Sequence, residues 1–262
     1  MRWYARTELL LGEAALARLG QARVTVLGLG GVGSFAVEAL ARAGVGHLRL
    51  VDHDVVGPSN LNRQLYALRS TLGRPKAEVA AERVHDINPD CAVEPCVAFI
   101  HRDTLPALLD PRPDVLVDAI DSLSCKVALL HTAHGMGIPI LSAMGAGGRT
   151  DSSQVRVGDL AATRNCPLAA RVRKELRKLG IIRGIRCVYS LDLAETRRPA
   201  DPRDVEPHRG PGRVRRPVGT VPYLPAILGL KVAEEVMRMI LGRIDQSFPA
   251  CLTGKQDSSR II

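Results

Sequence analysis

Carboxylate, amide and basic side chains gather in the first half of the sequence, just after short apolar runs. Asp52 and Asp54 follow one such run, and Asn60, Arg63 and Gln64 come shortly afterwards. A carboxylate at a strand end can accept hydrogen bonds from ribose hydroxyls, and fixed cations stabilise the negative charge that develops in phosphoryl chemistry. These residue types at this spacing predict a site that binds a nucleotide.

A glycine cluster precedes these residues. Gly28, Gly30, Gly31 and Gly33 lie between an apolar run and an alanine-rich segment. Glycines between a strand and a helix let the backbone approach phosphates at the helix N-terminus. The cluster alone is a weak signal, and together with Asp52 it would equally suit a nicotinamide-dependent dehydrogenase.

Two further side chains bear on whether the chain is a dehydrogenase. Lys76 lies in a Gly-Arg-Pro-Lys-Ala-Glu segment, and Asp121 follows a later apolar run. A dehydrogenase has no need of this lysine, this aspartate or the charged stretch at residues 52–64, so the pattern argues against a dehydrogenase. Each residue also has an ordinary interpretation: Arg63 and Lys76 could be solvated helix residues, and Asp121 could be the N-cap of the next helix.

Strands and helices must alternate to bring these residues together. The sequence predicts strands at residues 23–27, 47–51, 92–97, 114–117 and 138–142, and helices at residues 8–19, 32–43, 75–87, 105–109 and 122–136. This alternation is typical of a parallel sheet with helices on both faces, in which ligands bind at the carboxyl ends of the strands. We therefore predict an α/β fold with a doubly wound, mostly parallel, Rossmann-like sheet.

The pattern changes after residue 148. Residues 154–157 alternate as an edge strand would, residues 167–179 predict a strongly basic helix, and residues 220–241 predict a long apolar helix. Residues 197–217 hold seven arginines and several prolines, which predicts a mobile loop. We expect one domain spanning residues 1–262, with a nucleotide-binding core at 1–148 and a basic helical and strand extension at 149–262 that faces the substrate.

Composition limits the partners and the compartment. The net charge of +9 favours a polyanionic partner, although arginines on solvated faces would give the same charge. The six scattered cysteines form no CxxC pair, so neither a disulfide scaffold nor a structural zinc is expected. No apolar run is long enough for a membrane span, and no signal-peptide core follows Met1. We expect a cytoplasmic protein without membrane contact.

Residues 52–64 read D-x-D-x-V-x-x-S-N-L-N-R-Q. With the glycine cluster, the lysine and the late aspartate, this stretch resembles the superfamily that activates ubiquitin-like proteins and their bacterial sulfur-carrier relatives, over about residues 6–148. The resemblance implies an ATP-dependent adenylating enzyme. It assigns the following residues to ATP: Arg6, Gly28, Gly30, Gly31, Gly33, Asp52, Asp54, Asn60, Arg63, Gln64, Lys76 and Asp121.

The resemblance also implies individual roles. Arg63 and Lys76 would be the catalytic cations, Asp121 would hold Mg²⁺, and Asp52 would hold the ribose. Arg6 would reach across a homodimer into the neighbouring site.

The second half identifies a branch of this superfamily. Relatives that charge sulfur-carrier proteins usually hold zinc through two CxxC pairs, which this chain lacks. Residues 145–148, 159–161, 167–169 and 187–190 instead resemble the tRNA threonylcarbamoyladenosine dehydratase family. That family uses ATP to activate the carboxylate of the threonylcarbamoyl group on the adenosine beside the anticodon, and a neighbouring nitrogen then closes a ring. The resemblance implies modified tRNA as partner, a homodimer, and a cysteine desulfurase or sulfur acceptor as a further partner.

Two features of this half could serve the substrate. The basic helix would contact the tRNA backbone, unless it is simply a solvated face, through Arg171, Arg173, Lys174, Arg177 and Lys178. Cys187 matches a family cysteine that could act as a nucleophile, if Arg183 and Arg186 lower its pKa. The alternative for Cys187 is a small buried hydrophobic residue on a strand.

Two other functions stay open. A zinc-free adenylating enzyme that activates the C-terminus of a ubiquitin-like sulfur-carrier protein would dock a diglycine tail. A regulatory module that binds AMP or ATP without turnover would keep its function when Arg63 is replaced.

Overall fold

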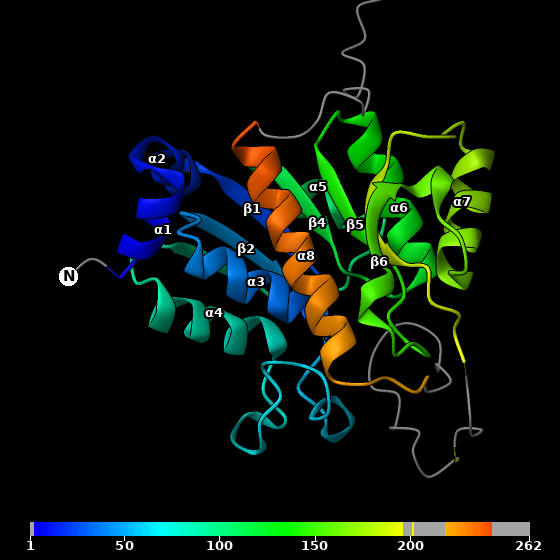
Figure 1. Ribbon diagram of the computed structural model, residues 1–262, viewed down its shortest axis with the longest axis horizontal. Helices are drawn as coiled ribbons and strands as arrows, with labels where there is room; N and C mark the ends of the chain where they lie inside the picture. The colour runs from blue at the N-terminus through cyan, green and yellow to red at the C-terminus, as the bar shows by residue number, and fades with distance from the viewer. Residues whose placement is uncertain (1–2, 196–200, 202–217, 243–262) are drawn as a thin grey trace, which may run out of the picture.

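The computed structural model describes residues 3–195, 201 and 218–242, and its centre is a seven-stranded sheet in the order β3-β2-β1-β4-β5-β7-β6 (Figure 1). The strands are β1 (Arg23–Leu27), β2 (His47–Val51), β3 (Ala92–Cys96), β4 (Val115–Asp118), β5 (Ile140–Ala143), β6 (Val155–Asp159) and β7 (Arg186–Ser190). All neighbours pair in parallel except β6, which is the antiparallel edge strand. The predicted doubly wound, mostly parallel α/β sheet is confirmed.

Helices cover both faces of this sheet. They are α1 (Ala5–Leu11), α2 (Glu13–Gln21), α3 (Gly33–Arg42), α4 (Lys76–Ile87), α5 (Leu105–Leu108), α6 (Leu123–Gly135), α7 (Pro167–Lys178) and α8 (Tyr223–Ile240). One core joins α3, α4 and α8 to strand residues such as Val26 and Val117, and a second joins α5, α6 and α7 to Leu27 and Leu116. Neighbouring residues of a strand point to opposite faces, so the continuous apolar strands fill both cores.

The element bounds agree with the sequence predictions within a few residues, with one exception. The single helix predicted at residues 8–19 is wrong, because Gly12 has φ +85° and separates α1 from α2. A residue in this left-handed region cannot continue a right-handed helix, and glycine adopts it without steric cost.

Apart from residue 201, the loop predicted at residues 197–217 lies outside the described residues. Among the helices described, none has the length and apolarity that crossing a membrane requires.

The position of the site follows from the strand order. β1 lies between β2 and β4. From β1 the chain adds β2 and β3 on one side, and the connection after β3 then crosses to β4 on the other side. This is the switch point at which doubly wound sheets open a crevice for ligands, at the carboxyl ends of the strands. The loops that follow β1, β2 and β4 therefore meet at one edge, and they carry most of the residues that the sequence assigns to ATP.

Candidate nucleotide-binding site

Two glycines of the cluster are required by the packing of the chain. Gly28 has φ +93°, and a Cβ there would lie 2.7 Å from the carbonyl oxygen of Ala119. A Cβ on Gly33 would lie 1.8 Å from the carbonyl oxygen of Gly28. These glycines let the loop after β1 pack closely on the loop after β4 and on the start of α3.

The other two glycines leave backbone groups available for a ligand. The N–H groups of Gly30, Gly31 and Val32 donate to no other atom of the described residues, and they lie at the N-terminus of α3. A Cβ on Gly30 would meet nothing closer than Gln64 Nε2 at 3.8 Å. Unpaired N–H groups at a helix N-terminus form an anion site, so this loop fits the phosphates of a nucleotide.

Asp52 joins the glycine loop to the loop after β2. The side chain is buried, its Oδ2 accepts a hydrogen bond from the Leu29 N–H at 2.7 Å, and its Oδ1 accepts one from the Asp54 N–H at 2.9 Å. A carboxylate has about four acceptor positions, so two are left for ribose hydroxyls. This position at the end of β2 fits the predicted ribose contact.

Lys76 is a buried cation at the first residue of α4. Its Nζ lies 3.0 Å from Oδ2 of Asp54, and its side chain is 6% exposed. The chain between β2 and α4 closes on itself, because Lys76 N donates to Asp54 O and Val55 forms a bridge with Pro75. This closure explains how residues 22 positions apart form one ion pair.

Asn60, Arg63 and Gln64 lie in the turns that follow β2. Asn60 is buried and its Oδ1 accepts from the Gly57 N–H at 3.2 Å, while Nη1 of Arg63 donates to the Ser59 carbonyl at 2.8 Å. A Cβ on Gly31 would lie 3.4 Å from Cγ of Arg63. The structure thus places Arg63 and Gln64 against the glycine loop.

Asp121 lies on the loop between β4 and α6, and its side chain is exposed. A carboxylate at this edge suits Mg²⁺, which prefers oxygen ligands. A group of oxygen and nitrogen donors lies on the loop after β2, where ligand atoms of Asp52, His53 and Asp54 lie within 4.8 Å of one another.

A buried polar network beneath this loop was missed in the sequence. Lys126 and Asp118 are fully buried, with Nζ 2.6 Å from Oδ2, and Ser142 Oγ donates to the same Oδ2 at 2.6 Å. Lys126 also donates to the carbonyl of Ala143 at 2.9 Å, so it ties the ends of β4 and β5 together. A lysine within an apolar helix pattern was the signal that could have revealed this network.

Arg6 lies at the opposite end of the sheet from its own glycine loop. It is an exposed residue of α1, and α2 ends beside the amino ends of β1 and β2, where Leu19 O accepts from Gly46 N and Ala22 O from His47 N. Figure 1 shows α1 and α2 on the left, away from the turns between β2 and α4 at the bottom. Within one chain the structure does not bring Arg6 to the site.

The basic helix α7 is confirmed, but one of its predicted nucleic-acid contacts needs correction. Arg173 is half-buried, and its Nη1 donates to the carbonyl oxygen and hydroxyl of Thr163, so it anchors the preceding turn. Lys178 pairs with Glu175 at 2.8 Å. Arg171, Lys174 and Arg177 are exposed.

Cys187 also needs correction as a nucleophile. It lies on β7, next to the edge strand β6, it is 0% exposed, and burial raises the pKa of its thiol well above the ordinary value. Arg186 does not activate it, because its guanidinium pairs with Glu235 at 2.6 Å. A thiolate is the nucleophilic form, and this environment disfavours it. Cys187 is therefore a buried core residue in this structure.

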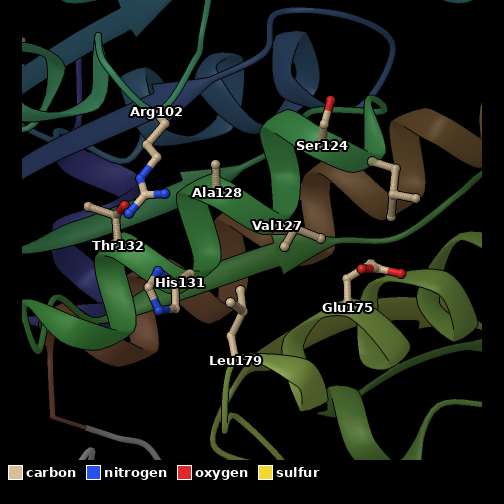
Figure 2. Close-up of a pocket in the computed structure, with 9 residues that line it drawn as sticks. Arg102, Ser124, Val127, Ala128, His131, Thr132, Glu175 and Leu179 are labelled. Atoms are coloured by element: carbon tan, nitrogen blue, oxygen red, sulfur yellow. The ribbon is translucent and has the colours of Figure 1, made fainter.

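A groove of about 450 Å³ lies between α6 and α7, apart from the residues assigned to ATP (Figure 2). Val127, Ala128 and Leu179 give it an apolar wall, and Arg102 and His131 lie toward one end. None of the residues assigned to ATP lines it.

Comparisons with known proteins agree with this geometry. The ThiF family model matches residues 4–256. The chain is 37% identical to tRNA threonylcarbamoyladenosine dehydratase of Bacillus subtilis (strain 168), over 92% of this chain and 96% of that protein. It is 41% identical to the dehydratase of Escherichia coli (strain K12), over 72% and 73% of the two chains.

A solved structure supports the same relationship. The crystal structure of the E. coli dehydratase in complex with ATP has a TM-score of 0.82 and 34% identity, and it covers 92% of this chain and 94% of that chain. Molybdopterin-synthase adenylyltransferase of E. coli (strain K12) is 37% identical, but over 47% of this chain. The chain therefore belongs to the ThiF family, among the tRNA threonylcarbamoyladenosine dehydratases.

Proposed function

We propose that this protein catalyses the ATP-dependent dehydration of threonylcarbamoyladenosine beside the tRNA anticodon. One observation carries the proposal: the similarity to the dehydratases spans 92% of the chain, and so includes both the nucleotide loops and the substrate-facing half. Similarity to the adenylyltransferase that serves a sulfur carrier covers 47%. We expect the reaction to take place in the cytoplasm.

The first step would activate the carboxylate of the threonylcarbamoyl group. A free carboxylate is a poor electrophile, so its attack on the α-phosphate of ATP, with loss of pyrophosphate, converts it to a mixed anhydride with AMP. Negative charge grows on the phosphates in this step. Arg63 lies against the glycine loop and Lys76 is held by Asp54, so both would supply fixed positive charge at the phosphates, and the N–H groups of Gly30 and Gly31 would add oriented dipoles.

The remaining assignments concern positioning. Asp52, Asp54, Asn60 and Gln64 would hold the ribose and the phosphates, and Asp121 would hold Mg²⁺. Magnesium supplies further charge neutralisation at the phosphates when it is bound. The neighbouring nitrogen of the modification then displaces AMP and closes the ring, so the net change is loss of water at the expense of ATP.

The substrate is a large polyanion. The chain carries a net charge of +9, and Arg171, Lys174 and Arg177 lie exposed on α7. Aromatic residues make up 3% of the chain, so we expect recognition to depend on phosphate contacts and on the modified nucleoside.

The test incubates the purified protein with ATP, Mg²⁺ and tRNA carrying threonylcarbamoyladenosine, and then digests the RNA for mass spectrometry. We expect a nucleoside lighter by one water, which is absent without ATP, with unmodified tRNA and with Arg63→Ala. If this product never forms while a carrier protein with a diglycine tail supports pyrophosphate exchange, the protein is a carrier-activating enzyme. If ATP binds but neither substrate is turned over, the regulatory module is the correct alternative.

A further inference from the structure

A buried arginine joins three loops on the substrate side of the site. Arg149 is 3% exposed. Its Nη1 donates to the carbonyl oxygens of Gly145 at 2.7 Å and Gly147 at 3.1 Å, its Nη2 to that of Asn165 at 2.8 Å, and its Nε to that of Asp192 at 3.1 Å. Within the described residues, all of its hydrogen bonds go to backbone carbonyls.

The three loops open at the same edge of the sheet as the glycine loop. Residues 144–151 follow β5, residues 163–166 precede α7, and residues 191–195 follow β7. β5 and β7 run parallel to β4, whose following loop carries Asp121. The Arg149 loops therefore flank the nucleotide crevice on the side away from β2 and Asp52. This side of the crevice is available to the carboxylate that is adenylated.

These loops obtain their shape from a few anchors, because they contain no long helix and no strand ladder. Asp192 accepts from the N–H groups of Thr150 and Asp151, both at 2.9 Å, and Gly148 N donates to Gly219 O at 2.7 Å. Gly148 has φ +74°, and a Cβ there would lie 3.0 Å from the Glu195 carbonyl. The guanidinium of Arg149 contacts all three loops.

We propose that Arg149 is a positioning residue for the acceptor half of the reaction. Its planar guanidinium holds the three loops in the arrangement that presents the carboxylate of the modified nucleoside to the α-phosphate of ATP. Arg149 is too deeply buried to contact the tRNA itself, so it acts through the loops that it joins. This inference rests on the proposed dehydratase function.

Two substitutions separate the geometry of this group from its charge. Arg149→Met removes every carbonyl contact, whereas Arg149→Lys keeps the charge but offers three donors in place of five. Arg156→Met is the matched control: Arg156 lies on the exposed edge strand, and its Nη1 donates to the carbonyls of Ser153 and Val155 within one turn. Thermal unfolding reports whether each variant is folded.

The experiment measures the Kd for ATP without tRNA, and the kcat and KM for modified tRNA at saturating ATP. We expect Arg149→Met to bind ATP within about twofold of the wild type while kcat/KM for tRNA falls at least tenfold. The kcat/KM of Arg149→Lys for tRNA should lie between the values of Arg149→Met and the wild type. Arg156→Met should have the kcat/KM of the wild type. If Arg149→Met does not fold, Arg149→Lys must still show a selective loss in kcat/KM.

Two results would overturn the inference: an unchanged kcat/KM for tRNA in folded Arg149 variants, or a loss of ATP affinity equal to the loss in kcat/KM. The second result would mean that Arg149 supports the fold in general. Failure of the proposed function is distinct, because then the wild-type protein itself forms no lighter nucleoside.

Discussion

The ammonium group of Lys76 lies 3.0 Å from Asp54 Oδ2 within a side chain that is 6% exposed. The family resemblance assigns Lys76 to the phosphates of ATP, where a fixed cation would stabilise charge that develops in the transition state, and removing one such group costs roughly 100-fold or more in kcat. We therefore expect Lys76→Met to lower kcat at least 100-fold, with a smaller change in the Kd for ATP. Steady-state product formation and calorimetric ATP binding measure the two effects.

The matched control for this prediction is Lys231→Met. Lys231 also pairs with a carboxylate, Glu234 at 2.7 Å, but on α8. It should retain wild-type kcat. A folded Lys76→Met protein within threefold of wild-type kcat would remove Lys76 from the catalytic group.

Cys187 supports a second prediction, on stability against pH. Burial raises the pKa of Cys187 above its ordinary value, whereas the thiol of an unfolded chain has a pKa of about 8.5. Above that pH the unfolded chain releases a proton that the folded chain retains, so the free energy of unfolding falls as pH rises. Replacing Cys187 with alanine removes this contribution. Between pH 7.5 and 9.5 the wild type should lose about 1 kcal/mol more than Cys187→Ala, as measured by urea unfolding.

The same variant tests the catalytic alternative. Because the thiol is buried and protonated, Cys187→Ala should keep kcat within about twofold, and native protein should resist alkylation at this residue. Loss of turnover in a stable Cys187→Ala protein would restore the nucleophile hypothesis.

Among the elements, α7 carries the prediction on tRNA. Arg171 and Lys174 are exposed on this helix, three residues apart, and their side chains lie on one face. Contacts to phosphate weaken as salt screens them. Arg171→Glu combined with Lys174→Glu should raise the KM for modified tRNA roughly tenfold near 0.1 M salt and less at higher salt, without changing ATP affinity.

The control for α7 makes the same change in net charge elsewhere. Lys231→Glu combined with Arg238→Glu alters α8, where both residues pair with Glu234 near the surface. If this control raises the KM for tRNA as much as the α7 variant does, binding depends on total charge and not on α7.

The sheet and the nucleotide loops could be predicted because their signals are local. The strand at residues 23–27, the glycines and the helix after them are contiguous, and periodicity placed the bounds of β1 and α3 within one or two residues. The break at Gly12 escaped prediction because apolar spacing continues across it. The network of Lys126 with Asp118 and the carbonyl cluster around Arg149 escaped because their partners lie on other elements. The two alternatives for Cys187, a nucleophile or a buried core residue, stayed open in the sequence because burial of a thiol depends on the whole sheet.

Arg6 and the nucleotide site lie at opposite ends of the sheet, so Arg6 could serve only a second copy. Beside Arg6, α1 exposes Leu9 and Leu10, at 88% and 84%. Neighbouring exposed apolar side chains of this kind mark interaction surfaces. A symmetric dimer in which α1 of each subunit packs beside the nucleotide site of the other would bring Arg6 to that site.

Complementation between subunits tests this arrangement. Arg6→Ala and Arg63→Ala should each abolish turnover, since every site in either homodimer lacks one arginine. When the two variants are mixed and subunits exchange, half of the dimers pair one variant with the other, and each such dimer has one complete site. About a quarter of wild-type activity should therefore return. If the mixture stays inactive while mass photometry shows mixed dimers, Arg6 lies outside the site of both subunits, because Arg6 is also far from the glycine loop of its own chain.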